Sequence, residues 1–201
     1  MSSHDEPLIT VLSVNIGRAQ KVSAQGGRSL LTAHGKLSTS QRVKVQTLGL
    51  EGDEQADLTV HGGRSKAVYA YPHEHYAFWQ TVRSQARLQL WDEVPEPGLL
   101  GENLSLRGLL EGQAWIGDRL KFADCVLAIS EPRMPCSKFD AVMGFKQASR
   151  MMVQSGFCGF YLSVTEPGSI AAGDVAQVIP GPRQVNIAEV FRSRAGRHHL
   201  R

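Results

Sequence analysis

The segment from residue 130 to residue 138 contains the residue types best suited to chemistry, including one cysteine, Cys136. Two prolines in this segment fix φ and remove backbone donors, so we predict a stiff loop rather than a helix interior or a central strand. Arg133 and Lys138 place positive charge on either side of the thiol. Nearby cations lower the pKa of a thiol, and the thiolate is the form that attacks electrophiles and binds metals. The alternative is an inert cysteine in a proline-rich turn.

Two regular elements must position this loop. The apolar run at residues 125–129 predicts a buried strand, in which Cys125 alternates in phase with other apolar residues and is therefore assigned to the core. A helical pattern begins at Asp140 and is ended by Gly156. Cys158, beyond that glycine, has no clear assignment. The thiol of Cys136 is thus predicted to lie at the end of a strand.

Two glycine-containing segments, residues 49–54 and 61–66, could contact an anion. Gly62 and Gly63 allow backbone N–H groups to approach a ligand closely, and Lys66 can neutralise its charge. The alternative is a glycine-rich turn between strands. Neither a Walker-type phosphate loop nor a dinucleotide-binding fingerprint is present in the sequence.

Residues 99–105 contain a carboxylate and an amide, Glu102 and Asn103, between a glycine and apolar neighbours. Both side chains could hydrogen-bond a heterocyclic ligand at a pocket, although an asparagine that stabilises a turn is equally consistent with the sequence. His73 and His75 are two residues apart near the start of a predicted helix and cannot easily share a metal. We interpret them as solvated histidines.

The composition limits the class of protein. A chain of 201 residues with a net charge of +3 is long enough for one domain and gives little support for nucleic-acid binding. Residues 1–7 are polar, and no apolar run is long enough to cross a membrane, so we expect a cytoplasmic protein without a membrane partner. Three cysteines without paired spacing fit neither a disulfide framework nor a structural zinc site.

Many short predicted strands with few helices indicate the fold class. The strands are expected at residues 8–16, 43–48, 67–71, 119–122, 125–129, 160–165 and 175–179, and an amphipathic helix is expected from Pro72 to Leu90. Because full closure removes exposed strand edges, this pattern favours a mainly β, barrel-like domain with attached helices.

Five motifs in this order resemble the MOSC family, domains related to the C-terminus of molybdenum-cofactor sulfurases. They are residues 49–53, 61–63, 101–104, 117–118 and 132–136, and the resemblance extends from about residue 8 to residue 179. It implies a closed β-barrel of short strands with peripheral helices and a cofactor between the motif loops. We expect a disordered N-terminus at residues 1–7, the MOSC domain at 8–182, and a short basic tail, a truncated helical extension, at 183–201.

The resemblance also implies roles for the candidate residues. Cys136 matches the family's distinctive cysteine and would be the molybdenum ligand, since the pterin dithiolene already supplies two sulfurs. Arg133, Lys66 and Lys138, with the backbone of Gly62 and Gly63, would contact the cofactor, and Asn103 would hydrogen-bond the pterin or the substrate. His61 is the first candidate for the proton donor, because its unperturbed pKa lies nearest neutrality, and Glu102 is the second.

The chain is most similar to stand-alone bacterial MOSC proteins that reduce N-hydroxylated purines such as 6-N-hydroxylaminopurine. This similarity implies a molybdenum-cofactor oxidoreductase that receives electrons from a separate flavoprotein reductase and could form a homodimer; pyridoxal phosphate is not expected. Two features depart from the family. Ser163 stands where many members have an arginine, and a helical C-terminal module is shortened to the pattern that begins at Val185.

Two other functions remain open from the sequence. Cys136 could carry a persulfide for the biosynthesis of a metal-sulfur cofactor. It could also act as a nucleophile on acyl groups with His61 as its base, although no spacing identifies such a pair.

Overall fold

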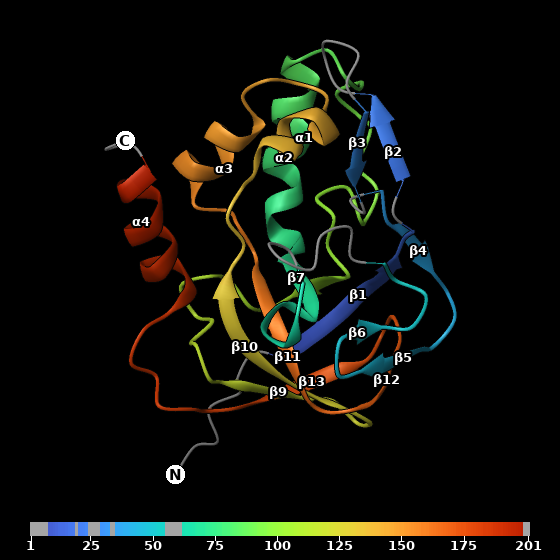
Figure 1. The fold of residues 1–201 in the computed structure, drawn as a ribbon, viewed down its shortest axis with the longest axis vertical. Helices are drawn as coiled ribbons and strands as arrows, with labels where there is room; N and C mark the ends of the chain where they lie inside the picture. The colour runs from blue at the N-terminus through green and yellow to red at the C-terminus, as the bar shows by residue number, and fades with distance from the viewer. Residues whose placement is uncertain (1–7, 19, 24–28, 33–34, 55–61, 199–201) are drawn as a thin grey trace.

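The computed structural model describes residues 8–18, 20–23, 29–32, 35–54 and 62–198. Most of its strands form one sheet that closes on itself, because its first and last barrel strands also pair (Figure 1). Around the barrel the strands are β13 (Val175–Ile179), β9 (Arg119–Lys121), β10 (Val126–Pro132), β11 (Phe160–Glu166), β7 (Val68–Pro72), β8 (Leu104–Arg107) and β1 (Ile9–Ile16). This confirms the predicted closed barrel.

The barrel is mixed rather than uniformly antiparallel. β7 and β8 run parallel, with Ala70 opposite Leu104, while the other barrel pairs are antiparallel. Closure comes from β1 and β13, where Ile9 lies opposite Ala176. Ile9 and Val11 in β1 are fully buried, as the alternation of apolar residues predicts. A register shift after Val11 marks a bulge, which allows this long strand to bend around the barrel.

Shorter strands extend or flank the barrel. β4 (Leu37–Thr39) pairs with β1, β2 (Gln20–Ser23) forms a hairpin with β3 (Ser29–Thr32), and a separate sheet contains β12 (Gly168–Ile170), β5 (Val43–Gln46) and β6 (Gly49–Leu50). The strand predicted at residues 43–48 therefore lies outside the barrel and is shorter than expected. The expected disorder of residues 1–7 concerns a segment outside the described residues.

The helices gather mainly over one end of the barrel (Figure 1). They are α1 (Tyr76–Gln85), α2 (Ser137–Met143), α3 (Ala148–Ser155) and α4 (Ile187–His198), with short 3-10 turns η1 (Arg64–Lys66) and η2 (His73–His75). Two predictions of helix extent were wrong. α1 ends at Gln85 because Arg87 adopts a left-handed conformation with φ 58°, and Leu90 beyond it is exposed.

The single helix predicted between Asp140 and Gly156 is two helices. Gly144 ends α2 in the left-handed conformation with φ 80°, and Gly156 ends α3 in the same way. Gly156 was predicted as a terminus and Gly144 was not. The break allows α2 and α3 to pack against each other.

The described part of the expected C-terminal tail is the helix α4, which lies beside β10. Ile187, Phe191 and Ala195 recur along one face of α4 and are buried in the domain. Cys125 is buried, as predicted from its phase in the strand. Among the described residues, no helix is both long and apolar enough to cross a membrane.

Candidate functional site

Cys136 lies where the chain passes from β10 to α2. The strand continues further than predicted, and Pro132 still pairs with Phe160 of β11. The loop therefore comprises residues 133–136, and Cys136 is the extended residue that precedes α2, with φ −124° and ψ 168°. Its side chain is partly exposed, whereas Cys125 and Cys158 are buried. Cys136 is thus the most accessible of the three thiols of the chain.

Arg133 occupies an enclosed aromatic site next to this loop. Its guanidinium carbon lies 4.7 Å from the ring centroid of Phe139 and 5.5 Å from that of Tyr69, and the side chain is 2% exposed. Its Nη1 also lies 3.7 Å from the sulfur of Met152. Cation–π contacts of this kind favour a buried guanidinium. The predicted contact of Arg133 with a phosphate stays a prediction.

The paired-glycine turn is docked onto the end of β10. Gly63 has φ 90°, and none of the atoms that the structure describes would lie within 4 Å of a Cβ placed there. Ser130 Oγ donates to the backbone oxygen of Ser65 at 2.5 Å, and Ser65 Oγ donates to Glu131 Oε1 at 3.2 Å. The turn and the strand that leads to Cys136 are therefore joined, as expected if both contribute to one site.

Two tyrosines connect the turn with the Cys136 loop, and neither was predicted as a site residue. Tyr161 lies under the ammonium of Lys66, with 5.8 Å from Nζ to the ring centroid, and it packs on Tyr69 at 5.4 Å between centroids. Burial raises the pKa of Tyr161; the charge of Arg133 opposes this shift, and the thiol of Cys136 reinforces it. The alternation in residues 160–165 indicates a strand, but it does not indicate that Tyr161 packs on Tyr69 and lies under Lys66.

Glu102 is fully buried, and its carboxylate binds its own chain. It accepts hydrogen bonds from the backbone N–H groups of Gly98 at 2.8 Å and Leu100 at 3.0 Å, from Ser105 Oγ at 3.0 Å, and from the hydroxyl of Tyr76. These four donors are enough to satisfy a carboxylate. In this structure, Glu102 therefore stabilises the loop that precedes β8.

Asn103 joins three segments of the chain. Its Oδ1 accepts from the backbone N–H of Tyr69 at 3.0 Å, and its Nδ2 donates to the backbone oxygen of Asn15 at 3.2 Å and to Asp53 Oδ2 at 2.8 Å. Asp53 also binds Lys36 in a buried ion pair. Two of the sequence motifs, residues 49–53 and 101–104, are thus held together through side chains.

The histidines differ from their predicted positions. His61 lies outside the described residues. His75 was predicted to be solvated, which is wrong: it is 7% exposed, and its Nε2 lies 2.8 Å from Glu111 Oε2. Its ring also stacks on Phe157 at 3.7 Å between centroids. The sequence could not indicate this pair, because Glu111 is 36 residues away.

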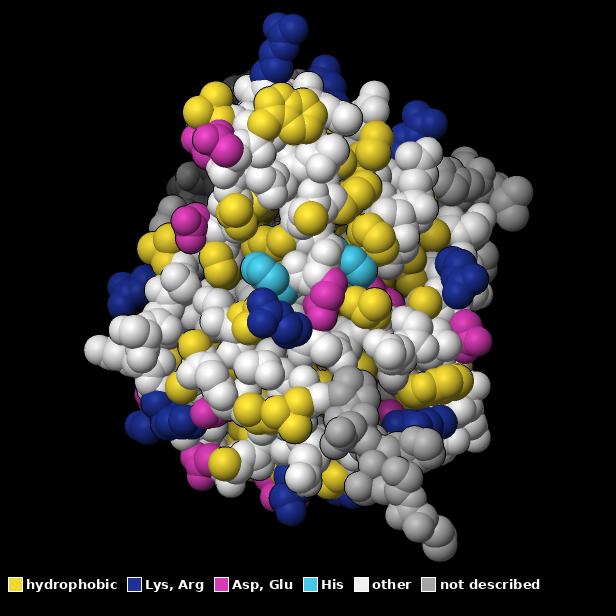
Figure 2. Space-filling model, turned by 180° about the vertical axis from the view of Figure 1, so that it is seen from behind, with side chains coloured by type: hydrophobic (Ala, Val, Ile, Leu, Met, Phe, Trp, Pro, Cys, Tyr) yellow, Lys and Arg dark blue, Asp and Glu magenta, His cyan; other side chains and the backbone are white. Residues whose placement is uncertain are grey.

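His73 lies beside this pair and is partly buried. Burial lowers the pKa of His73, and the charge of Arg107 lowers it further. Its Nδ1 has no hydrogen-bond partner among the described residues. Figure 2, seen from behind, shows two histidine side chains near the middle of the face, with acidic and basic side chains beside them.

A cavity of about 910 Å³ lies between α1, α2 and the loop that leads to Glu102. Lys36, Arg83, Gly98, Leu99 and Val142 are among the residues that line it. It thus touches the helix after Cys136 and the loop before Glu102. Its lining mixes apolar side chains with charged ones, and its volume falls within the range of small-molecule sites.

A metal ion that is bound by protein side chains alone needs several ligands in one place. Among residues 62–198 and the other described segments, no group of three or more His, Cys, Asp or Glu side chains could hold a metal ion. A single accessible thiol does not make a protein metal site by itself. It does fit a metal whose cofactor brings its own sulfur ligands.

The closed mixed barrel carries one partly exposed cysteine beyond the end of β10, the strand that is joined to the glycine turn. The chain belongs to the MOSC domain family, which matches residues 57–177. This family is associated with binding of the molybdenum cofactor.

Individual relatives agree with this assignment. The uncharacterized protein YflK of Bacillus subtilis (strain 168) is 36% identical over 164 residues, which are 82% of this chain and 70% of YflK. A reductase of Gibberella moniliformis (strain M3125 / FGSC 7600) is 31% identical over 194 residues, which cover 92% of this chain and 32% of the reductase. The crystal structure of YiiM from Geobacillus stearothermophilus has a TM-score of 0.74 at 24% identity, covering 94% of this chain and 85% of YiiM, and shows the same fold.

Proposed function

We propose that this chain binds the molybdenum cofactor through Cys136 and reduces N-hydroxylated compounds such as 6-N-hydroxylaminopurine. The observation that carries the proposal is the joining of the Cys136 strand to the glycine turn, through Ser130 and Ser65. A partly exposed thiol, the turn at Gly63 and the ammonium of Lys66 then lie at the same end of β10 and β11. The similarity to a protein named reductase supports a redox role.

The chemistry of the donor set fits this cofactor. A pterin dithiolene supplies two sulfur ligands, so the protein need add only one thiolate, and Cys136 is available for it. When bound, the cofactor supplies the exchange of two electrons that the reduction of an N–OH bond to N–H and water requires. The residues of the chain would bind and orient the cofactor and transfer a proton to the substrate.

Charge and hydrogen bonds define the proposed roles of the binding residues. Lys66, with the backbone N–H groups of Gly62 and Gly63, would contact the anionic phosphate of the cofactor; Lys138 is assigned the same role from the sequence, and its side chain lies outside the described part of the structure. Arg133 would provide positive charge from inside the aromatic enclosure, and Asn103 holds two of the motif loops together through its bonds to Tyr69 and Asp53. A charge held in a site of low dielectric acts more strongly than one in water.

We assign the role of proton donor to His61, because the unperturbed pKa of histidine is near neutrality. Tyr161 keeps its own proton at neutral pH because burial raises its pKa, so its hydroxyl can donate a hydrogen bond beside Cys136. Glu102 is enclosed by four donors, and we assign it to the support of the loop rather than to proton transfer. Electrons come from a separate flavoprotein reductase.

The proposal is tested by the metal content of protein purified from a host that makes the cofactor. The unaltered protein is expected to contain molybdenum and pterin in near-equal amounts and to reduce 6-N-hydroxylaminopurine with a chemical electron donor. Cys136→Ser should lose the metal and the activity together. Cys125→Ser is the matched control, because this buried thiol lies just before the same strand, at its other end, and should leave both unchanged.

Two outcomes contradict the proposal. Metal-free protein that still reduces the substrate would remove the cofactor from the reaction. A labile extra sulfur atom on Cys136, found by intact-protein mass spectrometry in the absence of bound molybdenum, would instead support the role of a persulfide carrier.

A further inference from the structure

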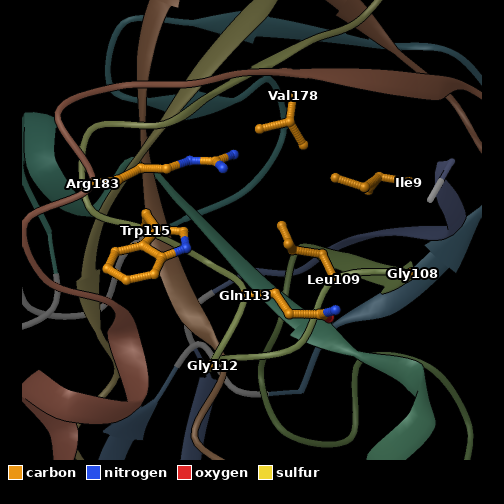
Figure 3. Close-up of a pocket in the computed structure, with 8 residues that line it drawn as sticks. All are labelled: Ile9, Gly108, Leu109, Gly112, Gln113, Trp115, Val178 and Arg183. Carbon is orange, nitrogen blue, oxygen red and sulfur yellow. The ribbon is translucent and has the colours of Figure 1, made fainter. Parts of the chain in front are cut away.

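A second pocket lies between the barrel and the segment that follows β8 (Figure 3). Its volume is about 300 Å³, which lies at the lower end of the range for small-molecule sites. Eight residues line it: Ile9, Gly108, Leu109, Gly112, Gln113, Trp115, Val178 and Arg183. None of them belongs to the segments that carry Cys136, the paired glycines or the tyrosine pair, so this pocket is distinct from the site described above.

The lining separates into an apolar side and a polar side. Figure 3 shows Ile9, Leu109 and Val178 on one side, while the guanidinium of Arg183 and the indole nitrogen of Trp115 face them from the other. Ile9 and Leu109 are buried, so the apolar wall is part of the core of the barrel. A ligand in this pocket would contact a fixed apolar surface on one side and hydrogen-bond donors on the other.

The polar side chains that line the pocket offer hydrogen-bond donors. Trp115 Nε1 makes no hydrogen bond with any residue that the structure describes, and an indole N–H can only donate. The amide of Gln113 uses its oxygen to accept from the backbone N–H of Leu110 at 3.3 Å, which leaves its NH₂ group as a donor. No aspartate or glutamate is among the eight lining residues. These donor side chains would favour a ligand that accepts hydrogen bonds.

Asp118 orients the charged donor. Its carboxylate, 1% exposed, accepts from Arg183 Nε at 3.1 and 3.3 Å and also from the backbone N–H of Gly181 at 2.7 Å. The side chain of Arg183 is 41% exposed and would otherwise be free to sample many rotamers. The motif at residues 117–118, which the proposed function leaves without a role, thus holds one cation at this pocket.

The backbone of Arg183 supports the same conclusion. Its φ of 48° is in the left-handed region, which a residue with a long side chain rarely adopts. Such conformations persist where the surrounding structure over-determines them, and they concentrate at binding sites. The bonds to Asp118 and the close approach of Gly181 to the carbonyl of Gly117 fix the turn in this form.

We propose that this pocket binds a small carboxylate with a compact apolar body, of the class of aromatic monocarboxylates. The apolar body contacts Ile9, Leu109 and Val178, and the carboxylate accepts from Arg183 and Trp115. Nε and Nη2 of Arg183 are bonded to Asp118, so Nη1 is the guanidinium nitrogen left for the ligand, and charge-assisted hydrogen bonds of this kind are a usual means of recognising a carboxylate. The inference goes beyond the proposed function and does not depend on molybdenum or on reductase activity.

The test uses benzoate as the probe and follows the indole N–H resonances of the ¹⁵N-labelled protein by NMR. The chain has three tryptophans, and the spectrum of Trp115→Phe assigns the relevant signal. Benzoate should shift the Trp115 resonance saturably, with a dissociation constant on the order of a millimolar, as suits a ligand of this size. Benzamide, which has the same shape without the charge, should bind about tenfold more weakly, or about 1.4 kcal/mol.

Arg183→Gln should weaken benzoate binding by a similar factor. Arg87→Gln is the matched control, since Arg87 is also an exposed arginine with a left-handed backbone but does not line the pocket, and it should not alter binding. Equal affinity for benzoate and benzamide, unchanged affinity in Arg183→Gln, or shifts confined to the other two tryptophans would overturn the proposal. If Arg183→Gln does not fold, the comparison of the two probes on the unaltered protein still decides.

Discussion

The hydroxyl of Ser130 donates to the backbone oxygen of Ser65 at 2.5 Å and so joins the end of β10 to the turn that begins at Gly63. Ser65 strengthens this junction through its bond to Glu131. Arg194 of α4 contacts the same carboxylate at 3.2 Å, so the C-terminal helix is connected to the junction as well. The separation between the thiol of Cys136 and the paired glycines is therefore set by a few side-chain bonds.

Replacing Ser130 with alanine should loosen this junction. Ser130 Oγ also lies 2.9 Å from the backbone oxygen of Tyr161, so its single hydrogen is shared between two carbonyl oxygens and the variant removes it from both. We expect the free energy of unfolding to fall by about 1 kcal/mol, measured by urea denaturation, and the molybdenum content to fall as well. Ser163→Ala is the control, because Ser163 Oγ makes only a long contact of 3.4 Å with Ala128. Equal losses in both variants would contradict a special role of the junction.

The three thiols should differ sharply in reactivity. Burial raises the pKa of Cys125 to about 11 and raises that of Cys158 well above its ordinary value, so neither forms appreciable thiolate at pH 8. Iodoacetamide at pH 8 is therefore expected to modify Cys136 alone, at one site per chain by peptide mass spectrometry. In urea all three should react, which serves as the control for reagent and time. Labelling of Cys125 at the rate of Cys136 would show that the thiols are not separated by burial.

The sequence predicted the parts of this molecule that depend on local patterns. Alternation of apolar residues placed Cys125 in the core, and two nearby prolines placed Cys136 in a loop at a strand end. These assignments succeed because the alternation of apolar residues and the backbone restriction imposed by proline both act over only a few residues. The many short strands favoured a barrel-like domain, and the resemblance to the MOSC family implied its closure, which the pairing of β1 with β13 confirms.

Contacts between distant segments could not be predicted in the same way. His75 was expected in solvent because its neighbours in sequence are polar, but folding brings Glu111 and Phe157 against it. Glu102 looked suited to a ligand, yet the chain itself supplies its donors. Gly144 was not recognised as a helix end, because a glycine within a periodic pattern can also be tolerated.

Replacing Glu102 with glutamine should test the role of this carboxylate as a support. Glutamine has nearly the same shape but brings an NH₂ group against the donors of Gly98, Leu100 and Tyr76. At least one buried donor then loses its acceptor, and we expect the free energy of unfolding to fall by about 1–3 kcal/mol. Urea denaturation at pH 7 measures the change.

The control for this variant is Glu96→Gln, since Glu96 is an exposed carboxylate in the preceding loop and should have little effect on stability. If Glu102→Gln keeps full stability but loses reduction of the substrate, Glu102 takes part in the reaction and its assignment as a support is wrong.

Asp174 should give the domain an acid-sensitive contribution to stability. The guanidinium of Arg42 donates two hydrogen bonds to it, at 2.7 and 2.8 Å, and these bonds hold the pKa of Asp174 below its ordinary value of 3.8. A carboxylate whose pKa is lowered by folding stabilises the protein above its unfolded pKa, and this stabilisation is lost as the pH falls through the folded pKa. Asp174→Asn should therefore melt at a lower temperature than the unaltered protein at pH 7, by about 2–4 °C for each kcal/mol lost, and the difference should shrink below about pH 4.

Glu51→Gln serves as the control, because the pair of Lys44 and Glu51 is more than half exposed at both ends and should contribute little at any pH. A melting difference for Asp174→Asn that stays constant from pH 7 to pH 3 would show that the effect is not linked to protonation of this carboxylate.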